Sequence, residues 1–273
     1  MNTEVRLMAV EDIDEVIHLC RGAGWNQTRQ DWNRLIRYQP NGCFAAVIDD
    51  QIVGTVTTTS YRDDLAWIGM MLVDERYRRR GVATRLMKAS LEHLTTQQVR
   101  CIKLDATPLG FPVYQRLGFR AEWGFQRWER GSKVNDESNR SVGDELNESH
   151  LTLDRQAFGA DRSAWLQLLA ADSTTVTHPL GFGMIRPGHL ADYLGPVVAE
   201  SVDAGSEIIQ QLLAQQTGRP VFWDLPHVRD EWGELPTKLG FQPVRDLTRM
   251  WFGTELVGGD VRQQFAIAEP ATG

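Results

Sequence analysis

The chain has 273 residues, a formal net charge of −7 and 42% hydrophobic residues, which is ordinary for a soluble globular protein of about two domains. No stretch approaches the roughly 20 apolar residues of a membrane span, and acidic residues near the N-terminus argue against a signal peptide. The acidic excess lies after residue 130, and there is no basic half such as a nucleic-acid-binding protein would need.

The cysteines Cys20, Cys43 and Cys101 are widely spaced and form neither a metal-binding pattern nor an evident disulfide set. We therefore expect a protein of the reducing cytoplasm that binds no metal ion. We also expect no nucleic-acid or membrane partner, and a monomer or a homodimer.

Hydrophobic periodicity predicts alternating strands and helices along the first half. In chain order these are a strand at 5–8, helices at 10–20 and 28–38, and strands at 43–48, 52–60 and 65–73. Short turns join the three later strands, which favours an antiparallel meander. A long amphipathic helix opens at Val82, a strand follows at 101–106, a short helix runs from Thr107 to Leu117, and a strand returns at 119–127.

The turn before the long helix is rich in arginine and contains a glycine. It consists of Arg78, Arg79, Arg80, Gly81, Val82, Ala83 and Thr84. The first N–H groups of a helix lack partners within the helix, and the helix dipole adds positive charge there. A glycine keeps side-chain bulk away from such a ligand site. The turn therefore has the chemistry of a pyrophosphate-binding site.

Two motifs resemble one known family. Arg78-x-x-Gly81-x-Ala83, directly after a strand ending in Met-Leu-Val-Asp, resembles the acyl-CoA-binding motif of the GNAT superfamily of N-acetyltransferases. Tyr114-Gln-Arg-Leu-Gly118-Phe119 resembles the closing motif of that family, and the order of elements over residues 4–130 matches it. The resemblance implies an α/β protein with a mixed sheet, the acyl-CoA N-acyltransferase fold.

The resemblance also implies acetyl-CoA as co-substrate and an enzyme that acetylates a primary amine of a small molecule or peptide by direct attack in a ternary complex. Tyr114 would be the general acid that protonates the departing thiolate. Thr107 stands where many GNAT enzymes carry an asparagine. The expected cofactor-binding residues are Met71, Leu72, Val73, Arg78, Arg79, Arg80, Gly81, Val82, Ala83, Thr84 and Thr107.

The attacking amine must first lose a proton, so a base or a water path is needed. The candidates are Asp105 at the end of a strand, Asp14 and Glu15 on the first helix, and Asp224 from the second half; none has a sequence signature. By the same resemblance, Trp25 and Asn26, between the first two helices, lie where GNAT proteins form a wall of the acceptor site, and we expect Trp223 and Asp224 to join them. A structural role is open for each carboxylate, and a core role for Trp67 and Trp223.

The polar stretch 131–150 is predicted to be a linker between a GNAT domain at 1–130 and a second unit at 151–273. That unit resembles a divergent copy of the first domain, in which a central strand at 193–199 precedes a helix at 204–216. Its strand-to-helix turn carries Glu200 and Asp203 in place of arginines, and Pro236 stands in place of the tyrosine. We expect this copy to shape the acceptor site without binding CoA.

Two further functions stay open on the sequence alone. The chain could be a non-catalytic acetyl-CoA-binding, sensing or regulatory protein, or it could acylate a hydroxyl or a protein N-terminus. Tyr114 beside an intact phosphate-binding turn favours the enzyme.

Overall fold

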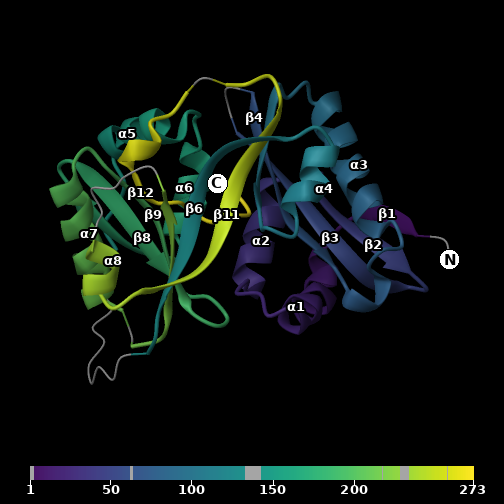
Figure 1. Cartoon of the computed structure of the whole chain (residues 1–273), viewed down its shortest axis with the longest axis horizontal. Helices are drawn as coiled ribbons and strands as arrows, with labels where there is room; N and C mark the ends of the chain where they lie inside the picture. Colours follow the sequence, from purple (N-terminus) through teal and green to yellow (C-terminus); the bar gives the residue numbers. More distant parts are fainter. Residues whose placement is uncertain (1–2, 62–63, 133–142, 217, 228–233, 257) are drawn as a thin grey trace.

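The computed structural model describes residues 3–61, 64–132, 143–216, 218–227, 234–256 and 258–273. A single mixed sheet runs through the molecule, with helices on both of its faces (Figure 1). Within these residues the sheet has 12 strands in the order β1-β2-β3-β4-β5-β11-β6-β10-β9-β8-β7, with β12 paired to β9. The predicted α/β class with a mixed sheet is confirmed, and so is the antiparallel meander of β2, β3 and β4.

The N-terminal half contains β1 (Glu4–Leu7), α1 (Ile13–Gly22), α2 (Arg29–Tyr38), β2 (Cys43–Ile48), β3 (Gln51–Ser60), β4 (Leu65–Val73), α3 (Val82–Thr96), β5 (Cys101–Ala106), α4 (Phe111–Arg116) and β6 (Arg120–Arg130). The C-terminal half contains α5 (Glu148–Phe158), α6 (Ser163–Ala170), β7 (Thr174–His178), β8 (Gly181–Arg186), β9 (Asp192–Ala199), α7 (Val202–Ala214), β10 (Val221–Pro226), α8 (Leu235–Lys238), β11 (Gln242–Gly253) and β12 (Gln264–Ala266). Short 3₁₀ turns lie at Val10–Asp12, Glu75–Tyr77 and Val261–Gln263.

The two faces of the N-terminal part of the sheet bury different clusters. On one face α3 covers a cluster that includes Ile68 and Leu104. On the other face α1 and α2 pack in a cluster with Trp67, and Phe158 and Trp165 of the C-terminal half belong to the same cluster. The α1/α2 face is therefore where the two halves meet, whereas the arginine-rich turn belongs to α3 on the opposite face.

Strand β11 of the C-terminal half lies between β5 and β6 of the N-terminal half. It pairs antiparallel with β5 from Gly253↔Cys101 to Thr248↔Ala106, and it also pairs along β6. Strand β6 in turn pairs with β10, with Val221 opposite Arg130. Strands β6 and β11 both cross the middle of the molecule (Figure 1). The predicted units 1–130 and 151–273 are therefore joined by backbone hydrogen bonds along two shared strands.

Part of the predicted linker 131–150 falls on residues 133–142, which lie outside the described residues. Its last residues are helical, because α5 already begins at Glu148. Asn147 caps this helix and its side chain accepts a hydrogen bond from His150 N at 3.2 Å. Asp144 accepts another from Thr177 N at 2.9 Å, which fixes this segment to β7.

We expect the whole chain to unfold in one cooperative transition, because β6 and β11 cannot leave the sheet without breaking pairs in both halves. Urea unfolding followed in parallel by far-ultraviolet circular dichroism and tryptophan fluorescence measures this. Coincident curves are the expected result, whereas two separate transitions would show that the halves unfold independently.

Candidate functional site

The turn from β4 to α3 has an open helix start. Gly81 is the N-cap residue of α3, with φ at 81°, a left-handed conformation that favours glycine. No side chain caps this helix in the described part of the chain, and Arg85 N donates to Gly81 O at 3.1 Å. Leaving aside its two chain neighbours, an ideal Cβ on Gly81 meets no atom of the described residues within 4 Å. The turn thus presents free N–H groups next to open space, as an anion site requires.

Arg78 and Arg80 make contacts within this turn, and Arg79 between them adds a third positive charge. Arg78 Nε donates to Val73 O at 3.2 Å, and Arg78 Nη1 lies 3.1 Å from Glu75 Oε1. The Arg80 guanidinium lies over the Tyr77 ring, 5.4 Å from its centroid. Arg79 itself has φ at 60°, so the backbone turns sharply just before Gly81.

Strand β4 contains a bulge just before the residues predicted to hold the cofactor arm. Met70 has φ at 49°, rare for a non-glycine residue, and its carbonyl accepts a hydrogen bond from Thr55 Oγ1 at 2.8 Å. Bulges and strained residues of this kind are frequent next to active sites. The sequence alone had not singled out this position.

Strands β4 and β5 are parallel, but their pairing covers only residues 65–67 and 101–103. Beyond these pairs, residues 68–73 of β4 and 104–106 of β5 separate in the described chain; we call this region the β4–β5 split. Among the described residues, no strand pairs with the edge of Met71, Leu72 and Val73 that faces β5, as expected for residues that hold a ligand by their backbone.

Tyr114 and Thr107 lie just after β5. Tyr114 is on α4, packed against Phe119 with ring centroids 6.1 Å apart, and burial raises the pKa of its phenol to about 12. Thr107 Oγ1 accepts a hydrogen bond from Gly110 N at 3.2 Å and so shapes the start of α4. The structure thus brings Tyr114 to the same side of the sheet as the turn, because both pack in the α3 cluster.

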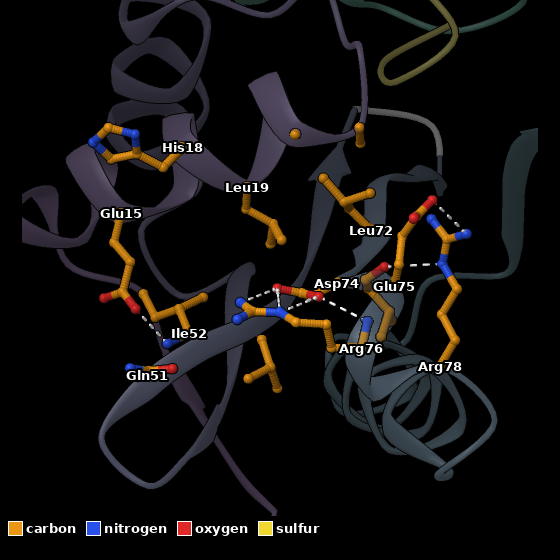
Figure 2. A pocket seen from close by; sticks show the side chains of 14 residues that line it. Glu15, His18, Leu19, Gln51, Ile52, Leu72, Asp74, Glu75, Arg76 and Arg78 are labelled. Atoms are coloured by element: carbon orange, nitrogen blue, oxygen red, sulfur yellow. Dashed lines mark hydrogen bonds and ion pairs between the residues drawn. The ribbon is translucent and has the colours of Figure 1, made fainter.

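A pocket of about 440 Å³ opens beside the end of β4, between α1 and β3 (Figure 2). Leu72, Val73 and Arg78, all predicted cofactor residues, line it together with Glu15 of α1. His18 also lines it, although the sequence alone had not pointed to this residue. Its position one helical turn after Glu15, on the polar side of the helix, was the available signal.

The carboxylates of the pocket already have partners. Glu15 Oε1 accepts a hydrogen bond from Ile52 N at 2.6 Å. Asp74 Oδ2 accepts one from Arg76 Nη2 at 2.7 Å, and hydrogen bonds from this arginine hold the pKa of Asp74 below its ordinary value. Asp14, the other candidate on α1, is exposed and forms an ion pair with Arg29.

The side chain of Asp105 is fully buried and forms an ion pair with a residue of the other half. Arg249 of β11 donates from Nε and Nη2 to its two oxygens at 2.9 and 3.0 Å. Burial raises the pKa of Asp105, and the arginine opposes that shift. The guanidinium also lies 4.3 Å from the ring centroids of both Trp67 and Trp123. The predicted role of Asp105 as base stays a prediction, and this enclosed ion pair does not favour it.

Asn26 holds the two halves together. Its Nδ2 donates to Ala191 O at 3.0 Å, and its Oδ1 accepts from Leu190 N and Ala191 N at 2.7 and 3.0 Å. Trp25 is partly buried against the α1/α2 cluster. The side chain of Asn26 is therefore occupied by backbone partners, and its predicted contact with an acceptor remains untested.

Trp223 and Asp224 lie in the interior of the C-terminal half. Trp223 Nε1 donates to Phe265 O at 2.8 Å. Asp224 accepts two hydrogen bonds from Arg127, at 2.8 and 2.6 Å, and another from the Tyr193 hydroxyl. Both side chains are fully buried, which does not favour the substrate contacts predicted for them.

The C-terminal half repeats the arrangement of β4, α3 and β5 as β9, α7 and β10. Here too the parallel pairing covers three positions, from Asp192↔Val221 to Leu194↔Trp223. Past them β12 pairs with β9 beside Val198, and Ile267 N donates to Asp224 O of β10 at 3.2 Å. The second split is therefore filled by the protein's own chain.

Two more contacts close this second copy. Phe265 of β12 is fully buried, and an ideal Cβ on Gly205 of α7 would lie 2.3 Å from its ring. Ser201 Oγ accepts a hydrogen bond from Ala204 N at 3.3 Å, so α7 is capped by a side chain where α3 is open. Both features agree with the expectation that this half does not bind CoA, which remains untested.

Among the described residues, the three cysteines are buried and free, and there is no cluster of histidine, cysteine and carboxylate side chains suited to a metal ion. None of the described helices is long and apolar enough to cross a bilayer.

Comparisons with known proteins agree with this geometry. Residues 10–119 match the family model described as the GNAT acetyltransferase family, and residues 150–266 match a second model described as a GNAT acetyltransferase domain. The uncharacterized N-acetyltransferase YitH of Bacillus subtilis is 26% identical over 245 residues, which cover 85% of each chain.

Solved structures of acetyltransferases also resemble this chain. A Pyrococcus horikoshii protein assigned as an acetyltransferase superposes with a TM-score of 0.85 at 25% identity, covering 99% of this chain and 96% of that one. A tandem GNAT protein from the clavulanic acid biosynthesis pathway superposes with a TM-score of 0.67 at 12% identity, covering 92% and 98%. The latter likeness concerns the fold alone.

Replacing Arg249 by methionine should lower the free energy of unfolding by about 3–5 kcal/mol, because it leaves the Asp105 carboxylate buried without a counter-charge. Denaturant unfolding measures the change. Arg262→Met, which removes an exposed ion pair with Asp260, is the matched control and should cost about 0–1 kcal/mol. The double variant Asp105→Leu/Arg249→Met should recover most of the loss. Equal stability of Arg249→Met and the wild type would show that the buried ion pair does not hold the halves together.

Proposed function

The chain belongs to the GNAT family of acetyltransferases, and on that premise we propose that it transfers an acetyl group from acetyl-CoA to a primary amine of a small molecule or peptide. The observation that carries the proposal is the open N-terminus of α3 at Gly81, directly after a β4 edge that pairs with no strand in the described part of the chain. The same two features are closed in the C-terminal half.

The residues of the turn fit the pyrophosphate of the co-substrate. The backbone N–H groups of Gly81, Val82, Ala83 and Thr84 donate to it, assisted by the positive end of the α3 dipole. The nearby arginines add long-range attraction for a polyanion. The backbone of Met71–Val73 carries the pantetheine arm along the β4–β5 split.

Acetyl-CoA, when bound, supplies a thioester whose carbonyl carbon an amine can attack. Tyr114 gives the proton of its Oη to the thiolate that departs. Its raised pKa suits this role, because the phenol stays protonated at every physiological pH.

The acceptor occupies the pocket between α1 and β3 at the end of β4, which Arg78 of the turn also lines. Attack is direct, in a ternary complex that holds the co-substrate and the amine from different faces of the sheet. Glu15 and His18 both line this pocket, and one of them takes a proton from the acceptor's ammonium, which leaves the neutral amine that attacks. Asp105 is left out of this step because of its ion pair with Arg249.

The test is a screen of amines, polyamines, amino acids and peptides with acetyl-CoA, following the release of free thiol. Amine-dependent release with formation of the acetylated amine supports the proposal. A protein that binds acetyl-CoA and acetylates none of these acceptors would instead support the non-catalytic alternative.

Gly81→Glu should raise the dissociation constant for acetyl-CoA at least about tenfold, because it places bulk and negative charge against a phosphate and strains a left-handed residue. Calorimetric titration measures this and should give one site per wild-type chain. Gly131→Glu makes the same change at a glycine whose added Cβ would meet no other described residue within 4 Å, and it is the matched control. Unchanged binding by folded Gly81→Glu, or two equivalent sites in the wild type, would contradict the assignment.

Tyr114→Phe keeps the ring and removes only the proton, so kcat should fall about 10²–10⁴-fold while the dissociation constant for acetyl-CoA stays the same. Because the phenol titrates near pH 12, the wild type should show no alkaline loss of kcat from this group below about pH 10. Tyr38→Phe, which removes a hydroxyl bonded to Ser60 O, is the control. Wild-type turnover in Tyr114→Phe would leave this residue a packing role only.

A further inference from the structure

The chain after β12 does not end at the surface of the C-terminal half. We call residues 267–273 the C-terminal tail. Its first residue, Ile267, is hydrogen-bonded to β10, and the tail then passes between the two halves. Every residue of the tail is buried except Pro270, which is partly buried. The tail consists mostly of residues with small or apolar side chains, and nothing in its sequence had marked it as part of the site.

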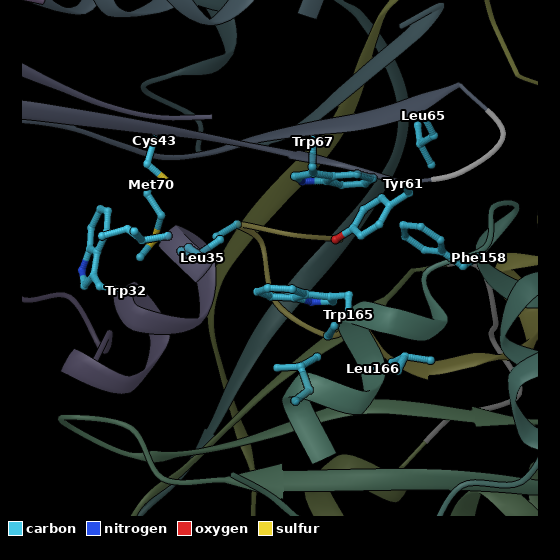
Figure 3. Packing of buried hydrophobic residues seen from close by; sticks show 14 of the residues in the cluster. Trp32, Leu35, Cys43, Tyr61, Leu65, Trp67, Met70, Phe158, Trp165 and Leu166 are labelled. Atoms are coloured by element: carbon cyan, nitrogen blue, oxygen red, sulfur yellow. The ribbon is translucent and has the colours of Figure 1, made fainter. Parts of the chain in front are cut away.

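The tail lies directly on β4. Trp67 Nε1 donates to Pro270 O at 3.2 Å, and the Tyr61 hydroxyl donates to Thr272 O at 2.6 Å. Gly69 is in contact with the tail backbone, since an ideal Cβ there would lie only 2.1 Å from Ala271 O. Phe158 packs beside Tyr61 and Trp67 (Figure 3), with its ring centroid 5.3 and 6.0 Å from theirs.

Side chains of the C-terminal half fix the tail from its other side. Arg186 Nη2 donates to Ala268 O at 3.0 Å and lies 3.4 Å from Glu269 Oε2. Arg162, held by two hydrogen bonds to Asp154, donates to Gly273 O. The position of the tail is therefore set by buried polar contacts from both halves.

The tail and the pocket divide one face of β4 between them. Trp67 and Leu72 both belong to the α1/α2 cluster, because the bulge at Met70 shifts the alternation of side chains between them. The tail covers β4 at Trp67 and Gly69, while the pocket opens at Leu72. The described lining of the pocket includes no tail residue, because the buried side chain of Met70 separates Leu72 from Gly69 on this face. An acceptor that extends along β4 past Met70 would meet the tail.

We propose that residues 269–272 of the tail form the inner wall of the acceptor site and thereby limit the length of the amine that the enzyme accepts. The inference rests on the function proposed above. The C-terminal half would thus take a direct part in substrate selection. It does so through the tail, which follows the strand that fills the split of that half and then covers β4. The wall is made largely of backbone and small side chains, so it excludes long acceptors by shape rather than by charge.

Gly69→Ala tests this, because the new methyl group cannot coexist with Ala271 O and must displace the tail from β4. The measurement is kcat/KM for a series of linear primary amines of increasing length, with hydrogen exchange of the tail amides to report displacement. The wild type should favour short amines, and the variant should gain at least about tenfold in kcat/KM for the long ones, the selectivity that a shape-defined pocket typically provides. Gly131→Ala, a methyl group added in open space, should leave the profile unchanged.

Tyr61→Phe is the second variant, since it removes one anchor of the tail without adding bulk and keeps the test valid if Gly69→Ala does not fold. It should shift the profile in the same direction by a smaller factor. Faster exchange of the tail amides with an unchanged length profile would overturn this inference and would leave the proposed function untouched. Equal use of short and long amines by the wild type would also overturn it. A wild type that binds acetyl-CoA and acetylates no amine would overturn the proposed function, and this inference with it.

Discussion

The structure depends on one strand, β11, which is inserted between β5 and β6. Because this strand completes the sheet of the N-terminal half, the end of β5 is fixed by residues of the C-terminal half. The buried pair of Arg249 with Asp105 follows directly from the insertion. A second buried pair, Arg127 with Asp224, comes from the pairing of β6 with β10 on the other side of β6. Buried ion pairs of this kind tolerate no loss of a single partner, so the two halves constrain each other strongly.

The two halves share one arrangement of strands and helix, in which the gap between two parallel strands is open in one half and filled in the other. Each has a parallel strand pair that separates after three positions and a helix that begins beside the separation. In the N-terminal half no described segment enters the separation, and the helix begins at a glycine that no described side chain caps. In the C-terminal half β12 enters the separation, Phe265 fills the space beside α7, and Ser201 caps that helix. The difference lies in a few local substitutions together with the path of the tail.

The sequence by itself determined the local features of the site. A glycine in a left-handed position, the uncapped N-terminus of an amphipathic helix and the apolar strand before it are all encoded within residues 65–94, so the turn and β4 could be predicted from neighbouring residues. Tyr114 was placed in the same way, by the short helix between β5 and β6. The bulge at Met70 was missed, because no residue type marks it and its carbonyl is held by Thr55 of the neighbouring strand.

Only the tertiary structure decided what surrounds these features. Asp105 and Arg249 are 144 residues apart, and no periodicity of a single strand shows which strand will lie beside it. The same holds for the contact between Gly69 and the C-terminal tail, and for Asn26, whose amide bonds to residues 190 and 191 of the other half. Trp223 and Asp224 were expected to face a substrate, yet they are enclosed by pairing and packing that local sequence does not contain. Local propensity and capping act over a few residues, whereas strand order and burial depend on contacts between distant segments.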